Sequence, residues 1–138
     1  MDDLITKLNT ILADEKICVT ALRSAAAKCN DPYQQALTQR VLNNCRLVCT
    51  EVEILIVGLG HLAAPNQRMQ PQLSEKTLAE NLAMVESIQR RLITEIDLIL
   101  AESNLKCDTA PLRAIRQFHT DNMHWLAQAM GMNPQRDH

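Results

Sequence analysis

The stretch ALTQRVLNNCRLVCTEVEILIVGLGHLAA, residues 36–64, decides the fold, because it is the longest apolar run in the chain and contains no proline. At about 100° per residue, one face of such a helix collects six of its side chains. These are Val41, Cys45, Val48, Val52, Leu55 and Leu59. Leu47, Ile54 and Val57 lie outside that face, so this helix is apolar nearly all round. It needs neighbours on most sides, and we expect a second copy of the chain to be one of them.

Composition favours helices over strands. Hydrophobic residues make up 46% of the 138 residues, aromatic residues only 2%, and there are three glycines. That mixture is typical of helices packed through aliphatic side chains, and the length suits one domain spanning 1–138. Arg46, Glu51 and Glu53 interrupt the apolar run, so no membrane span is predicted.

Charge and cysteine usage exclude several classes of protein. The formal net charge of −2 gives no drive toward nucleic acid or an anionic membrane, and the basic residues form no run. The N-terminus does not resemble a signal peptide. Five cysteines without the spacing of a disulfide scaffold predict reduced thiols, and hence a cytoplasmic protein. The sequence shows no glycine-rich phosphate loop and no nucleophile elbow.

Apolar periodicity predicts four helices, at about residues 3–28, 32–62, 75–103 and 111–130. Asp31 is expected to cap the second helix, and Ser74 the third. Two short turns and one long connection, residues 63–74, indicate an all-α four-helix bundle. The dozen residues of that connection reach about 40 Å when extended, roughly the length of a helix. Reach alone leaves open whether the connection crosses the bundle or joins adjacent ends.

Polar side chains interrupt the inward stripe of each helix near its middle. The four residues are Glu15, Cys45, Gln89 and His119. Folding each hairpin about its turn brings residue 15 level with about 45, and residue 89 level with about 120. We therefore expect the four side chains to meet in one central layer, whichever path the long connection takes.

Two interpretations of this layer remain open. A carboxylate, a thiolate, an amide oxygen and an imidazole form a ligand set that suits a single zinc, iron or copper ion. Alternatively, Glu15 pairs with Arg116 or with His119, because buried polar groups usually satisfy one another. A catalytic pair of Cys45 and His119 is disfavoured, because it would lie deep in a bundle without an evident cleft.

Three segments carry a resemblance to a known family. LITKLNTILADEKICVTAL (4–22), VLNNCRLVCTEVEILIVGLGHL (41–62) and RAIRQFHTDNMHWLAQAM (113–130) together resemble the small bacterial ferritin-like proteins, which are related to rubrerythrin and the ferritins. The resemblance lies in pattern and placement over nearly the whole chain. It implies a ferritin-like four-helix bundle.

The resemblance also implies a ligand set, which the sequence only partly retains. Metal-binding members use one glutamate on each of two helices and Glu-x-x-His on the other two. Glu15 matches the glutamate of the first helix, and His119 matches the histidine of the Glu-x-x-His motif on the fourth helix. Four further ligand positions hold other residue types, namely Cys45, Val48, Gln89 and Arg116. Because most anionic ligands are missing, the resemblance implies a degenerate member without a di-iron centre.

These observations lead to three functional hypotheses. The first is a non-enzymatic ferritin-like protein, homodimeric through its second helix. The second is a mononuclear metal-binding or redox protein that uses Glu15, Cys45 and His119. The third is a helical chaperone or adaptor that binds a helix of a partner protein.

Overall fold

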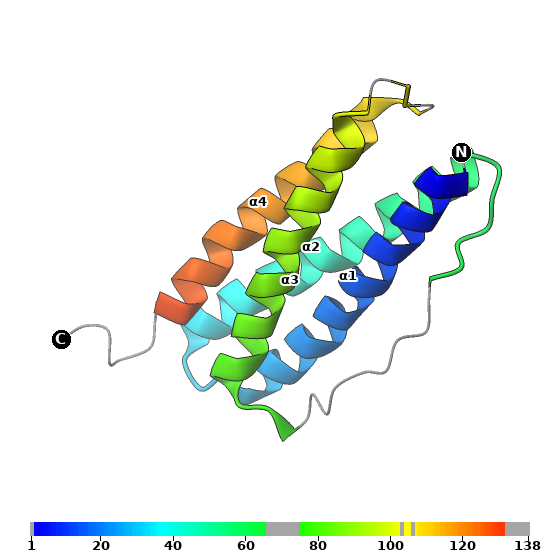
Figure 1. Ribbon diagram of the computed structural model, residues 1–138. Helices are drawn as coiled ribbons and strands as arrows, with labels where there is room; N and C mark the ends of the chain where they lie inside the picture. Colours follow the sequence, from blue (N-terminus) through cyan, green and yellow to red (C-terminus); the bar gives the residue numbers. More distant parts are fainter. Residues whose placement is uncertain (1, 66–74, 103, 106, 132–138) are drawn as a thin grey trace.

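The described part of the protein consists of four α-helices and the segments that join them (Figure 1). The computed structural model describes residues 2–65, 75–102, 104–105 and 107–131. The helices are α1 (Asp2–Lys28), α2 (Pro32–Gly58), α3 (Leu78–Leu100) and α4 (Thr109–Gly131). The described ranges contain no β-strand, which confirms the all-α class. No helix within them is long and apolar enough to cross a membrane.

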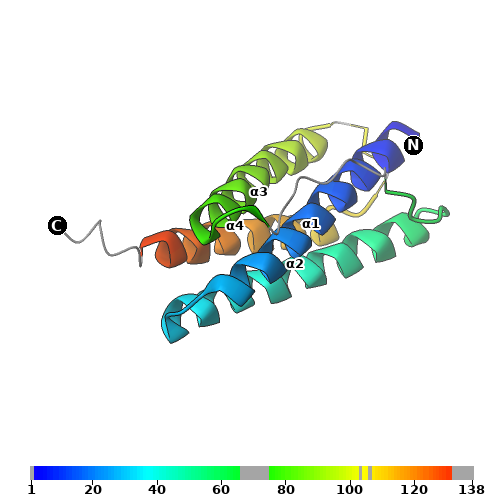
Figure 2. The same cartoon turned by 90° about the horizontal axis from the view of Figure 1, so that it is seen from below.

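Each helix packs against two others, so that the four occupy the corners of a square (Figures 1 and 2). α1 and α4 each contact both α2 and α3. Side-chain hydrogen bonds between helix ends fix the directions. Lys7 near the start of α1 donates to Glu102 beyond the end of α3 at 2.8 Å, and Gln34 at the start of α2 donates to the carbonyl of Ala129 at the end of α4 at 3.0 Å. Neighbouring helices are therefore antiparallel.

The long connection crosses the bundle from end to end. The amide of Ala64 donates to the side chain of Asn9, near the start of α1, at 2.8 Å. The ammonium of Lys28, the last residue of α1, donates to the carbonyl of Lys76. Asn9 and Lys28 are separated by about 28 Å of helix, so residues 64 and 76 lie at opposite ends of the bundle. As a result α2 and α3 run in the same direction (Figure 1). They lie at diagonal corners, because the neighbours of each are α1 and α4.

α2 ends earlier than the periodicity predicts. It ends at Gly58 instead of residue 62. Gly60 has φ of 89°, a left-handed conformation that glycine adopts without strain. The amide of Gly60 donates to the carbonyl of Val57, and the amide of His61 donates to that of Ile56. These bonds satisfy terminal carbonyl groups that a helix leaves unpaired, so Gly60 stops the helix although the apolar pattern continues.

The starts of α2 and α3 are set by capping side chains. Asp31 accepts a hydrogen bond from the amide of Gln34 at 2.9 Å, which confirms the predicted cap. Thr77 caps α3 by a reciprocal arrangement with Glu80, in which each side chain accepts from the other's backbone amide. α3 therefore begins three residues later than predicted. Ser74, the expected cap, lies outside the described residues.

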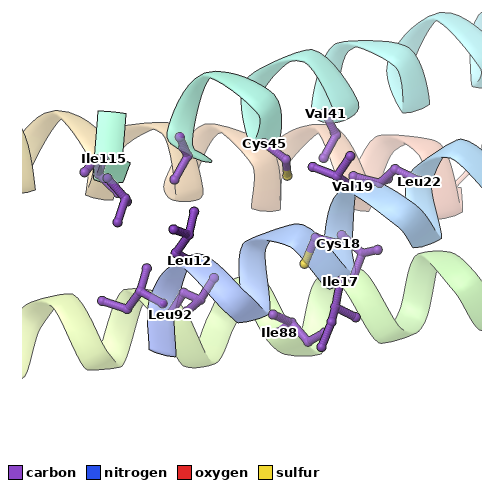
Figure 3. Packing of buried hydrophobic residues seen from close by; sticks show 14 of the residues in the cluster. Leu12, Ile17, Cys18, Val19, Leu22, Val41, Cys45, Ile88, Leu92 and Ile115 are labelled. Carbon is purple, nitrogen blue, oxygen red and sulfur yellow. The ribbon is translucent and has the colours of Figure 1, made fainter. Parts of the chain in front are cut away.

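The core is built from aliphatic side chains of all four helices (Figure 3). Of the six inward positions predicted for α2, four are buried: Val41, Cys45, Val48 and Val52. Leu55 and Leu59 are half-buried instead, and Ile56 is the fully buried residue at this end of α2. The three positions predicted to lie off this face are exposed, Leu47 to 50%, Ile54 to 59% and Val57 to 56%.

Candidate functional site: a buried polar layer

The predicted polar residues meet in the interior, at mid-length of the bundle. α1 supplies Glu15, α2 Cys45, α3 Gln89 and α4 His119, and all four are fully buried. Each belongs to an amphipathic helix whose buried side is mostly aliphatic. The stripe forces the polar side chain inward, where it must find a partner.

The carboxylate of Glu15 is the centre of this layer. Its Oε1 lies 2.6 Å from Nε2 of His119 across the bundle diagonal. Its Oε2 accepts a hydrogen bond from Nε2 of Gln89 at 2.9 Å. Both carboxylate oxygens therefore have protein partners. The pairing of Glu15 with His119 is one of the two that the sequence leaves open.

The other predicted pairing, between Glu15 and Arg116, is wrong. Arg116 binds Asp97 of α3 through two contacts, Nε to Oδ1 at 2.5 Å and Nη2 to Oδ2 at 3.1 Å. Its guanidinium lies at the edge of α4, where the long side chain reaches solvent and avoids the cost of burial. Hydrogen bonding to Arg116 lowers the pKa of Asp97.

Amide side chains extend the hydrogen-bonded layer to α2. Oε1 of Gln89 accepts from Nδ2 of Asn122 at 2.9 Å, and Oδ1 of Asn122 accepts from Nδ2 of Asn44 at 2.9 Å. A continuous chain of hydrogen bonds thus links α1, α3, α4 and α2. Sequence reasoning does not find Asn44, because it precedes Cys45 at the margin of the inward face. The inward position of Asn122 can be predicted from the sequence, since it follows His119 by about one helical turn.

Two thiols lie against this network. Sγ of Cys18 is 3.4 Å from Nε2 of Gln89, and Sγ of Cys45 is 3.7 Å from Nδ2 of Asn122. Burial, followed by the negative charge of Glu15, raises the pKa of both thiols well above the ordinary value. The same two causes raise the pKa of Cys49 to about 12. These cysteines are therefore neutral near pH 7 and are poor nucleophiles.

His119 keeps one ring nitrogen unused. Its Nδ1 is buried and has no hydrogen-bond partner within the described residues. Nε2 already engages Glu15, so the bond to the carboxylate fixes the orientation of the ring. Nδ1 is thus the one ring atom of His119 still available to a further ligand.

The donor set does not fit a di-iron centre. Such a centre needs several carboxylates, and the layer offers only Glu15. Val48 is apolar, the amide nitrogen of Gln89 faces the carboxylate, and Arg116 is turned to the surface. Among the described residues, no group of three or more His, Cys, Asp or Glu side chains is placed to hold a metal ion. An ion bound by Glu15, Cys45, Gln89 and His119 would have to displace the hydrogen bonds that join them.

Comparison with known proteins adds no relative. No family model matches the chain, and no curated protein or solved structure is significantly similar to it.

Proposed function

We propose that the protein is a non-enzymatic, ferritin-like bundle in which a hydrogen-bonded polar layer replaces the di-iron centre of such bundles. The observation that carries the proposal is the state of Glu15. Its two oxygens are engaged by His119 and Gln89, so the single central carboxylate is satisfied by the protein itself. Burial raises the pKa of the thiols around it, which makes them poor nucleophiles.

The topology supports the ferritin-like part of this proposal. One long connection crosses the bundle and leaves α2 parallel to α3, while α1–α2 and α3–α4 are hairpins. Ferritin-like folds differ from simple up-and-down bundles by one such crossover.

The polar layer has a structural role in this proposal. A buried network is satisfied in one alignment of the helices, and sliding any helix by a turn would leave buried groups unpaired. The layer thereby selects one register among the many that an aliphatic core alone would tolerate.

Metal analysis tests the proposal. We expect protein purified without chelators, and protein incubated with Fe(II) or Zn(II) and desalted, to contain far less than one ion per chain. The control is a comparison with Cys45→Ser and His119→Ala, with helicity followed by circular dichroism. One ion per chain, lost in both variants while helicity persists, would overturn the proposal in favour of a mononuclear site.

We also propose that the protein is a homodimer through α2. Leu47, Ile54 and Val57 form an outward apolar stripe on this helix. Two copies of α2 packed antiparallel about a two-fold axis near residue 50 would set Leu47 of each chain against Ile54 of the other. The alternative occupant of this stripe is a helix of a partner protein, as expected of a chaperone or adaptor. Five free thiols suit a cytoplasmic location for either assembly.

A further inference from the structure

A second feature of the molecule lies apart from the central layer, in a surface cavity between α1 and α2. Its volume is about 440 Å³. Three cationic side chains line it: Lys16 and Arg23 from α1, and Arg46 from α2. Thr20, Thr50 and the half-buried thiol of Cys49 complete its polar lining, and no described carboxylate takes part in it.

The three cations have no ion-pair partner among the described residues. Some basic residues of the bundle do form ion pairs, as Lys7 does with Glu102 and Arg91 with Asp14. Glu53 lies one turn beyond Cys49, and its charge and that of Lys16 both influence the pKa of this thiol. No ion pair nevertheless joins Glu53 to Lys16 in the described part of the chain. The cavity thus gathers three positive charges that form no ion pair within the described residues, in a chain of net charge −2.

Like charges held around one cavity repel each other, and a bound anion relieves that repulsion. Guanidinium groups match the paired oxygens of a phosphate, while a lysine ammonium acts as a point charge. The hydroxyls contribute less, because Thr20 donates to the carbonyl of Lys16 at 3.2 Å and Thr50 to that of Arg46 at 3.3 Å. The cationic groups must therefore carry the recognition.

We propose that this cavity binds a small anion that carries a phosphate group, a phosphomonoester or a diphosphate. Arg23 and Arg46 bind the phosphate oxygens from opposite helices, and Lys16 neutralises the remaining charge. The cavity is in the size range of small-molecule sites. Val19 and Cys49 offer an apolar wall to the carbon part of the ligand.

Titration with inorganic pyrophosphate tests the proposal. Binding is measured by calorimetry and by amide chemical shifts in NMR spectra, at fixed ionic strength. We expect saturable 1:1 binding, with shifts concentrated at Lys16, Thr20 and Cys49. Arg46→Gln should weaken binding by about tenfold, because it removes one charge-assisted contact.

The matched control is Arg113→Gln, which removes one exposed cation from α4, away from the cavity. It should leave the affinity unchanged. Lys16→Gln, on the other wall, provides a second test should Arg46→Gln reduce helicity. Absence of saturable binding, or an equal loss in Arg113→Gln, would overturn the proposal. Equal affinity for citrate would overturn the assignment to phosphate, and inorganic phosphate in parallel distinguishes a monophosphate site from a diphosphate site.

Discussion

At the residue scale, the central polar contact of the interior is the pair of Glu15 and His119. Both side chains are fully buried, and their contact of 2.6 Å is the shortest within the layer. A buried carboxylate without a partner is costly, whereas a paired and hydrogen-bonded one is tolerated. The pair is therefore a site where removing one partner harms the protein more than removing both.

The first prediction follows from this asymmetry. His119→Ala should lower the free energy of unfolding by about 3–5 kcal/mol, because it leaves the buried carboxylate of Glu15 with the neutral amide of Gln89 and without its histidine partner. Adding Glu15→Gln to that variant should restore part of the loss, since the buried charge is then gone. Urea unfolding followed by circular dichroism measures both. Arg116→Ala is the control and should have a much smaller effect, because its ion pair with Asp97 is exposed. Strictly additive effects in the double variant would contradict the prediction.

The second prediction concerns alkaline pH. The pKa of Cys49 is raised from 9.0 to about 12 in the folded protein. A group whose pKa is raised on folding contributes stability that is present below its unfolded pKa and is lost as pH rises toward the folded value. Stability should therefore decline between about pH 9 and 12, and Cys49→Ala should make that decline shallower. Urea midpoints of both proteins between pH 7 and 10.5 measure this effect. A constant difference between the two proteins across the range would contradict it.

Single residues were predictable to different degrees. Glu15, Gln89 and His119 stand out in the sequence because each interrupts an aliphatic stripe at helical spacing. Arg116 also has inward spacing, but its long side chain leaves the interior for Asp97. Asn44 lies outside the stripe, yet the amide reaches Asn122 because α2 and α4 are neighbours. Periodicity gives the direction of a Cα–Cβ bond, and does not give the end point of a long or marginal side chain.

At the scale of the helix, α3 shows how local signals compete. Glu75 and the residues around it are compatible with helix, but the helix begins only after Thr77. The reciprocal hydrogen bonds between Thr77 and Glu80 satisfy two terminal amides. One turn earlier, the sequence has Thr77 at the position where such an arrangement with Ser74 would need Glu or Gln. The spacing Thr-x-x-Glu at 77–80 is visible in the sequence and identifies the cap.

The third prediction tests this cap. Thr77→Ala should lower the free energy of unfolding by about 1 kcal/mol, because the amide of Glu80 loses its acceptor. Thr94→Ala is the matched control, since Thr94 is exposed in the interior of the same helix and alanine has the higher helix propensity. Urea unfolding compares the two variants. Equal losses would show that Thr77 has no special role.

At the scale of the whole molecule, the crossing connection determines which helices are neighbours. Because α2 and α3 lie at diagonal corners, the neighbours of α2 are α1 and α4. Both pack against its inward side. Its outward face keeps the apolar residues Leu47, Ile54 and Val57 exposed. This surface is the basis of the proposed dimer.

The fourth prediction is that the protein is dimeric in solution and that Leu47→Glu converts it to a monomer. A charge facing the apolar Ile54 of the partner subunit would remain without compensation in the interface. Leu98→Glu is the control, because Leu98 is 59% exposed on α3, away from α2. Sedimentation equilibrium measures both masses. A monomeric wild-type protein would exclude the dimer and favour binding of a different partner at this stripe.

The sequence by itself determined the number of helices, the face that each one buries and the presence of a central polar layer. These features depend on spacing along one helix, and local periodicity encodes them directly. The tertiary structure alone decided that the long connection crosses the bundle, that Glu15 pairs with His119 instead of Arg116, and that Lys16, Arg23 and Arg46 surround one cavity. Each of these depends on which helices become neighbours. Such contacts join residues far apart in the chain. The stretch at 36–64 specifies α2, but it does not specify which helices pack against α2.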